Sequence, residues 1–174
     1  ELLSGCLFAL CYKVFGISYE FFIAVILSSL VIIIFVSDSK YMIINDSPLI
    51  VSAILIFIIK WLDTGILSAL MSLVYGLIIF GVAYLLMLFG SLAFKQEALG
   101  GGDIKLSFVA GMVLGVKLGI LYIVLASFLA FPYAVYVTLK NKDNMLPFGP
   151  FLVSSLLIIY LNMNIISEII KVIF

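Results

Sequence analysis

Gly100-Gly101-Gly102-Asp103 stands near the middle of the chain, between an apolar run over residues 66–94 and another that begins at Ile104. The chain has 174 residues, of which 66% are hydrophobic and 10% are charged, and its mean hydropathy is +1.41. Soluble chains are typically about 25% charged, whereas a helix that crosses a bilayer needs about 20 apolar residues. We therefore predict an all-α, polytopic membrane protein.

Seven apolar segments are candidate membrane spans, so we expect about seven transmembrane helices. In chain order they are Leu2–Phe15, Ile17–Val36, Pro48–Leu62, Ile66–Phe94, Ile104 to about Val116, Leu118–Leu139 and Pro147 to about Tyr160. The tail over residues 165–174 is expected to lie on the membrane surface or to continue the seventh span. We expect residues 1–174 to form a single membrane domain.

Asp38 and Asp103 each lie at the edge of a predicted span. If the spans alternate in direction, both emerge on the same membrane face, an inference that depends on the third and fourth spans. Lysine near span ends marks the cytoplasmic side. Five lysines are predicted on the Asp face and four on the other: Lys40, Lys95, Lys105, Lys140 and Lys142 against Lys13, Lys60, Lys117 and Lys171. This small excess predicts that the Asp face is cytoplasmic.

The composition also narrows the function. The net charge is zero, which gives no support to nucleic-acid binding. Because the chain has no His, catalysis by Ser-His or Cys-His pairs is excluded and the commonest zinc ligand is missing. Cys6 and Cys11 lie five apart in an apolar run, a spacing that predicts packing residues. We expect no metal site.

Asp38 and Asp103 are the candidate catalytic residues. An Asp at the edge of a membrane span is costly, because its charged form loses water. Two carboxyl groups that share a proton can activate a water molecule and stabilise the oxyanion of peptide hydrolysis. Their positions at span ends give them access to water. The alternative interpretation is that Asp103 caps a helix and Asp38 caps a turn.

Two glycines are candidate supporting residues at the same site. Gly100 and Gly102 permit backbone conformations closed to other residues, and their lack of side chains would let a substrate strand approach the main chain. The alternative is a flexible turn before a helix. Asp63 lies in a D-T-G turn on the opposite predicted face and is expected to play no catalytic part.

Two further patterns predict local structure. Gly111 and Gly115 form a G-x-x-x-G pair, which favours close helix packing rather than a dimer contact. Asn45-Asp46-Ser47-Pro48 is a typical helix start.

Four short stretches carry a resemblance to a known family. They are Leu-Gly-Gly-Gly-Asp-Ile-Lys-Leu at 99–106, Pro-Phe-Gly-Pro-Phe-Leu at 147–152, Asp38 followed by Ile44-Asn45-Asp46, and Glu-Leu-Leu-Ser-Gly at 1–5. In this order they resemble the motifs of bacterial type IV prepilin peptidases, which are GxGD aspartyl proteases. Asn45 stands where the family usually has Pro, so the turn after Asp38 is expected to be less rigid.

The resemblance implies that Asp38 and Asp103 remove the short leader of type IV prepilins or pseudopilins. The cut follows a Gly, at the cytoplasmic face of the bacterial inner membrane. Lys105 matches a family Lys, which leaves three roles open: pairing with a carboxylate, contact with substrate, or contact with lipid phosphate.

Many members of the family also methylate the new N-terminus with S-adenosylmethionine, but the sequence shows no separate nucleotide-binding pattern. The peptidase reaction itself needs no cofactor. Larger members begin with a further span and a zinc-binding cytoplasmic loop, neither of which we expect here. Membrane lipid is an expected partner, whereas the oligomeric state is left open.

Other functions stay as alternatives. A preflagellin peptidase or a presenilin-like protease shares the G-x-G-D pattern, although presenilin-like enzymes usually have Tyr-Asp where this chain has Ser37-Asp38. A proton-coupled transporter also uses membrane carboxylates, but its sites usually lie at the membrane midplane and not at span ends. A structural subunit would give the two Asp residues no shared purpose.

Overall fold

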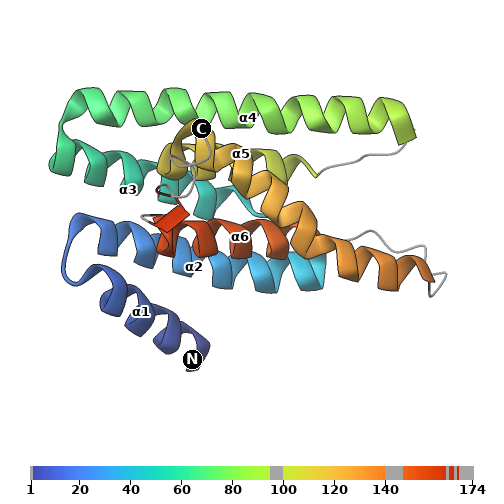
Figure 1. Cartoon of the computed structure of the whole chain (residues 1–174), viewed down its shortest axis with the longest axis horizontal. Coiled ribbons are helices and arrows are strands. Elements are labelled where there is room, and N and C mark those ends of the chain that lie inside the picture. Colours follow the sequence, from blue (N-terminus) through green and yellow to red (C-terminus); the bar gives the residue numbers. More distant parts are fainter. Residues whose placement is uncertain (1, 95–99, 140–146, 164, 167, 169–174) are drawn as a thin grey trace.

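A computed structural model of the chain describes residues 2–94, 100–139, 147–163, 165–166 and 168 (Figure 1). Over these residues the protein is all-helical, with no strand. The elements are α1 (Leu2–Phe15), α2 (Tyr19–Tyr41), α3 (Asp46–Thr64), α4 (Ile66–Phe94), α5 (Gly101–Leu139) and α6 (Gly149–Leu161). The predicted all-α class is confirmed.

Polar side chains mark the starts of two helices. Ser18 Oγ accepts a hydrogen bond from the N–H of Phe21 at 3.3 Å before α2. Asn45 Oδ1 accepts one from the N–H of Ser47 at 3.4 Å before α3, so the predicted helix start is confirmed. At its other end, α2 runs past the predicted limit and stops where Met42 adopts a left-handed conformation, with φ 53°.

A break at Gly115 divides α5 into two helical halves, residues 101–114 and 116–139. Gly115 has φ 72° and ψ −172°, a conformation that residues with a side chain rarely adopt. The two halves correspond to the predicted fifth and sixth spans, and the break lies two residues before Lys117, near which those spans were predicted to meet. In Figure 1 the chain turns back at this break, so the second half returns toward the end where α5 begins.

Lys60 caps the C-terminal end of the first half of α5. Its Nζ donates a hydrogen bond to the carbonyl oxygen of Met112 at 2.7 Å. An unbroken helix would pair that carbonyl with the amide of residue 116, so the break at Gly115 frees it for Lys60. Lys60 therefore turns into the protein, and does not serve as the surface charge that the topology prediction counted.

Four helix ends meet at one end of the bundle, which we call the Asp end. It comprises the end of α2 with Asp38 and the starts of α3, α5 and α6, which contact one another through Asp46, Lys105 and Gly149. At the opposite end, Tyr160 of α6 donates a hydrogen bond to the Glu20 side chain of α2. The prediction that Asp38 and Asp103 lie on one face agrees with this arrangement.

Glycine allows α4 and α5 to pack closely. A Cβ on Gly76 of α4 would lie 2.8 Å from Met112 Cγ, and one on Gly111 of α5 would lie 2.9 Å from Gly76 Cα. The predicted packing role of Gly111 is confirmed. The helix that it packs against belongs to the same chain, so this contact is not a dimer contact. A Cβ on Gly115, the other member of the pair, would lie 4.0 Å from Tyr75 Cδ2, an ordinary contact, and Gly115 forms the break in α5 instead.

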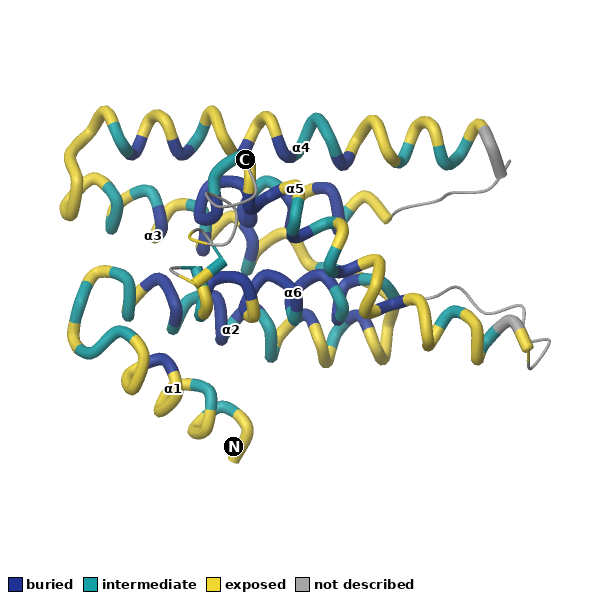
Figure 2. The backbone as a smooth tube through the Cα atoms, in the orientation of Figure 1, coloured by how far each residue is buried: buried dark blue, intermediate teal, exposed yellow. Residues whose placement is uncertain are grey.

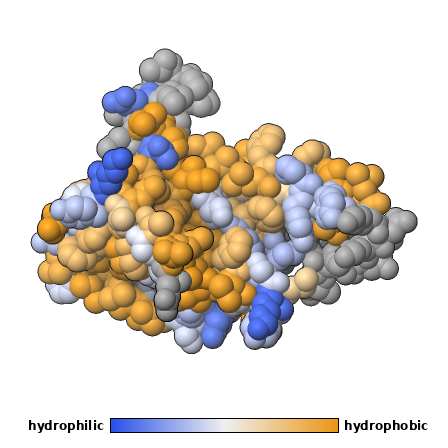
Figure 3. All heavy atoms as spheres, turned by 90° about the horizontal axis from the view of Figure 1, so that it is seen from below, coloured by the Kyte–Doolittle hydropathy of each residue, from blue (hydrophilic) through white to orange (hydrophobic). Residues whose placement is uncertain are grey.

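The most buried helices are α6 and the first half of α5, whereas much of α1, α3 and α4 faces outward (Figure 2). Much of the outward surface is apolar, as Figure 3 shows for one face. Four helices among the described residues, α2 to α5, are long and apolar enough to cross a membrane, and α1 and α6 are shorter apolar helices. The chain is therefore a polytopic membrane protein. Lys95, Lys140, Lys142, Lys171 and most of the 165–174 tail lie outside the described residues.

Candidate active site

Asp38 lies in the last turn of α2, and only 6% of its surface is exposed. A carboxylate at this position faces the negative end of its own helix dipole, which is unfavourable. The start of α6 compensates, because the N–H of Gly149 donates a hydrogen bond to Asp38 Oδ2 at 2.9 Å. Gly149 is the first residue of α6, and the adjacent Pro150 has no N–H to offer. Asp38 is thus bound at the positive end of a second helix.

Asp103 is the third residue of α5 and is as buried as Asp38, with 6% of its surface exposed. Its Oδ2 accepts a hydrogen bond from the N–H of Gly100 at 3.3 Å. This contact resembles half of a capping box, in which the third helical residue reaches back to the cap. The helix-cap interpretation of Asp103 therefore accounts for Oδ2. It does not account for Oδ1, which is buried and has no hydrogen-bond partner among the described residues.

The two carboxyl groups lie within range of each other's charge at the Asp end. Each is held through one oxygen by a backbone N–H at the start of a helix, Gly149 for Asp38 and Gly100 for Asp103.

Ile44 fills the space between the two glycine-containing segments. A Cβ on Gly102 would lie 2.5 Å from Ile44 Cβ, and a Cβ on Gly149 would lie 3.1 Å from Ile44 Cδ1. A Cβ on Gly149 would also lie 2.7 Å from Asp38 Oδ2. The small size of Gly102 therefore makes room for Ile44 of the same chain, where the sequence had suggested room for a substrate.

Lys105 pairs with Asp46, one of the three roles that the sequence left open. Lys105 Nζ lies 2.6 Å from Asp46 Oδ2 and 2.7 Å from Oδ1, and both side chains are 52% exposed. The pair joins the starts of α5 and α3, since Asp46 is the first residue of α3. Lys105 thus links two helix starts at the Asp end.

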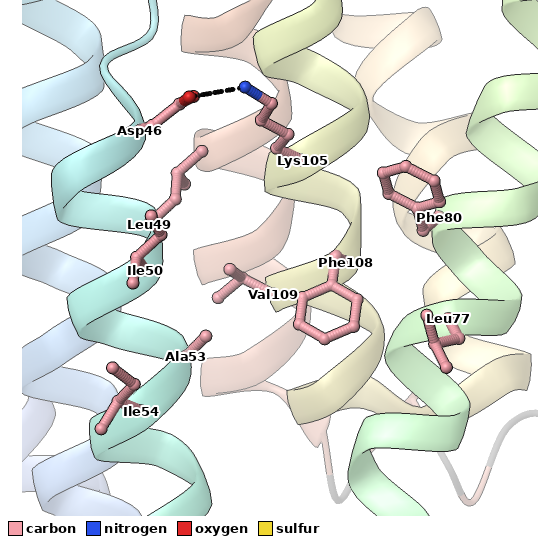
Figure 4. A pocket seen from close by; sticks show the side chains of 10 residues that line it. All are labelled: Asp46, Leu49, Ile50, Ala53, Ile54, Leu77, Phe80, Lys105, Phe108 and Val109. Atoms are coloured by element: carbon pink, nitrogen blue, oxygen red, sulfur yellow. Dashed lines mark hydrogen bonds and ion pairs between the residues drawn. The ribbon is translucent and has the colours of Figure 1, made fainter.

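A pocket of about 440 Å³ lies below this ion pair, between α3, α4 and α5 (Figure 4). Asp46 and Lys105 are its polar residues, and they bond to each other at its upper end in the view. The other lining residues are apolar: Leu49, Ile50, Ala53, Ile54, Leu77, Phe80, Phe108 and Val109. The pocket is therefore suited to apolar groups.

The remaining candidates lie elsewhere. Asp63 is exposed in the last turn of α3, away from Asp38 and Asp103, as expected for a residue outside the site. Within the described parts of the chain, no three His, Cys, Asp or Glu residues are arranged to hold a metal ion.

The match with a known family covers these residues. The model of the type IV leader peptidase family matches residues 25–135, a range that includes Asp38 and Asp103. The chain belongs to the type IV leader peptidase family. Among curated proteins, this leader peptidase family member is similar to the prepilin leader peptidase/N-methyltransferase of Bacillus subtilis (strain 168), with 37% identity over 164 residues. The aligned region covers 92% of this chain but 64% of that relative. No solved structure matches the chain at a significant level.

Sequence reasoning did not assign roles to Gly149 and Ile44. Both lie in stretches that carried the family resemblance, Pro-Phe-Gly-Pro at 147–150 and Ile44-Asn45-Asp46. The available signal was Pro147-Phe148-Gly149-Pro150, because the two prolines have no N–H and leave only Phe148 and Gly149 as amide donors in this stretch. In this member of the leader peptidase family, the Gly149 amide holds Asp38.

Proposed function

We propose that the chain is a membrane aspartyl endopeptidase that removes the leader from type IV prepilins or pseudopilins. Family membership and the name of the Bacillus relative support the substrate class. The observation that carries the proposal is the pair of buried carboxyl groups, Asp38 and Asp103, at one end of the bundle. Cleavage after Gly, at the cytoplasmic face of the bacterial inner membrane, is part of the proposal.

In the proposed reaction, Asp38 and Asp103 share a proton and hold a water molecule between them. The ionised group takes a proton from the water as it attacks the scissile carbonyl, and the protonated group donates a hydrogen bond to the developing oxyanion. The pair titrates as a unit, so these roles belong to the pair and not to one residue. The N–H groups of Gly149 and Gly100 fix one oxygen of each carboxyl group in place.

Supporting roles follow from the contacts at the Asp end. Gly100 holds Asp103 through its amide, and Gly102 admits Ile44 beside the site. Lys105 joins the start of α5, which carries Asp103, to the start of α3 through Asp46. We propose that these three residues position the catalytic pair, and that residues 1–174 act as one membrane peptidase unit surrounded by lipid.

N-methylation is the second activity in the name of the Bacillus relative. The methyl donor of such a reaction, S-adenosylmethionine, has ribose and amino-acid groups that need polar partners. The pocket in Figure 4 does not fit this donor, because its lining is apolar apart from an ion pair that is already satisfied. We therefore derive no methylation step for the described residues.

Leader removal from a precursor tests the proposal. The chain is co-expressed with a type IV pilin precursor in cells that lack their own leader peptidase, and the N-terminus of the pilin is read by mass spectrometry. We expect loss of the leader, with the new N-terminus directly after a Gly. An intact precursor beside a folded, membrane-inserted chain would contradict the proposal. Cleavage of a flagellin precursor, with the pilin precursor left intact, would favour the preflagellin alternative.

A further inference from the structure

Tyr122 is a buried polar residue that the proposed reaction has not used. It lies in the second half of α5 and is fully buried, with 0% of its surface exposed. Its hydroxyl group has no hydrogen-bond partner among the described residues. A buried hydroxyl without a partner costs free energy, so its position calls for an explanation.

The Tyr122 hydroxyl lies beside the Ser107 side chain, within range of the charge of Asp103. Ser107 is one helical turn after Asp103 and donates its own hydrogen bond to the Asp103 carbonyl oxygen at 2.9 Å. The break at Gly115 makes this approach possible, because it lets the second half of α5 return alongside the first.

Two unpartnered atoms therefore occur in one buried region, the Tyr122 hydroxyl and Asp103 Oδ1. One is a donor and the other is an acceptor, so they are chemically complementary. A buried water molecule usually makes two to four hydrogen bonds to such groups. It would accept from Tyr122, donate to Asp103 Oδ1 and lie next to the Ser107 oxygen.

A hydrogen bond from α6 fixes the backbone of Tyr122. The Ser155 hydroxyl of α6 donates a hydrogen bond to the Tyr122 carbonyl oxygen at 3.1 Å. The same helix supplies the Gly149 amide that binds Asp38. Helix α6 therefore supplies the amide that holds Asp38 and also contacts the backbone of Tyr122.

We propose that Tyr122 is a positioning residue, which holds a water molecule on Asp103 Oδ1 and so fixes that carboxyl group toward Asp38. An effect of Tyr122 on catalysis rests on the proposed peptidase function. The water-mediated hydrogen bond between Tyr122 and Asp103 does not depend on that function. Tyr122 acts through Asp103 and does not touch the substrate. Substitution should therefore change the rate of the chemical step and leave substrate binding unchanged.

The test is Tyr122→Phe, which keeps the ring and removes the hydroxyl group. With purified chain and a pilin precursor, we expect kcat to fall roughly tenfold, the value for the loss of about one net hydrogen bond. KM should stay unchanged, and the pH profile of kcat should move. Tyr84→Phe, at an exposed position on α4, is the matched control and should behave as wild type.

A second readout does not depend on activity. The infrared carboxyl band of Asp103, identified by its loss in Asp103→Asn, should shift in Tyr122→Phe but not in Tyr84→Phe. An unshifted band in folded Tyr122→Phe would overturn the inference, whatever happens to kcat. If the wild-type chain fails to cleave the precursor, the peptidase proposal fails. The inference about Tyr122 is then tested by the shift of the Asp103 infrared band alone. If Tyr122→Phe does not fold, Ser107→Ala replaces it, with the same shift expected and an unshifted band again contradicting the inference.

Discussion

The amide of Gly149 donates a hydrogen bond of 2.9 Å to Asp38 Oδ2, joining two residues that lie 111 positions apart in the sequence. The contact brings the start of α6 to the end of α2 and gives a buried carboxylate a partner. In the proposed mechanism it fixes Asp38 relative to Asp103.

Gly149→Ala should impair catalysis strongly. The added Cβ would lie 2.7 Å from Asp38 Oδ2 and 3.1 Å from Asp38 Cγ, so the carboxyl group must move. We expect at least a roughly tenfold loss in the rate of leader removal, since displacements of about 1 Å cost this much or more. Gly81→Ala, with open space around it on α4, is the control. Wild-type activity of Gly149→Ala would show that the contact is dispensable.

Gly101 and Gly102 are neighbours that should respond differently to alanine. A Cβ on Gly102 would lie 2.5 Å from Ile44 Cβ, whereas a Cβ on Gly101 would meet nothing within 4 Å. Gly102→Ala should therefore slow leader removal and Gly101→Ala should not. The double variant Gly102→Ala/Ile44→Ala should recover part of the rate, because it removes the clash. Equal rates for the two single variants would refute this explanation of the G-x-G-D spacing.

Reversing the ion pair between Lys105 and Asp46 tests whether Lys105 acts through Asp46. Lys105→Asp places two negative charges where 2.6 Å now separates opposite charges, and Asp46→Lys does the converse. Each single reversal should reduce leader removal, and the double reversal should restore it. The effect on folding stability should be small, about 0–1 kcal/mol, because both side chains are half exposed. Failure of the double reversal to restore activity would favour direct contact of Lys105 with the substrate.

Gly76 should matter for stability. A Cβ there would lie 2.8 Å from Met112 Cγ and 2.9 Å from the carbonyl oxygen of Phe108, so α4 and α5 would separate. Gly76→Ala should lower the free energy of unfolding in detergent by about 1–3 kcal/mol, as overpacking usually does. Gly81→Ala on the same helix should be neutral or slightly stabilising, since Ala favours helix. Equal stability of the two variants would contradict the packing described for this helix pair.

Much of the fold followed from the apolar pattern, because membrane helices must satisfy their backbone hydrogen bonds internally. The ends of α4 were predicted to the residue, and α3 and α6 to within two. The end of α2 was missed because Asp38 looked like a stop signal, yet it lies inside the helix and finds its partner on α6. Tertiary contacts of this kind leave no local pattern. The break at Gly115 was located only to within two residues for a similar reason, since glycine inside an apolar run predicts packing and a turn equally well.

The candidate site shows the same division. Asp38 and Asp103 were identified as a pair for two reasons: a charged side chain at a membrane edge costs free energy, and spans of alternating direction place both residues on one face. The structure brings both to one end of the bundle. The pairing of Lys105 with Asp46 was not assigned, because these residues are 59 positions apart. Tyr122 resembled any other aromatic core residue in the sequence. Its unpartnered hydroxyl became visible only with the second half of α5 folded back on the first.

The central claim is that Asp38 and Asp103 act as one catalytic unit, and the most direct test compares their single and double substitutions. Initial rates of leader removal are measured for Asp38→Ala, Asp103→Ala, the double variant and Asp63→Ala, with equal amounts of folded protein. Residues that act as a unit give non-additive losses. We predict that either single substitution lowers the rate to the same residual level as the double variant, while Asp63→Ala cleaves like wild type. Substantial cleavage by Asp38→Ala or by Asp103→Ala would contradict the account.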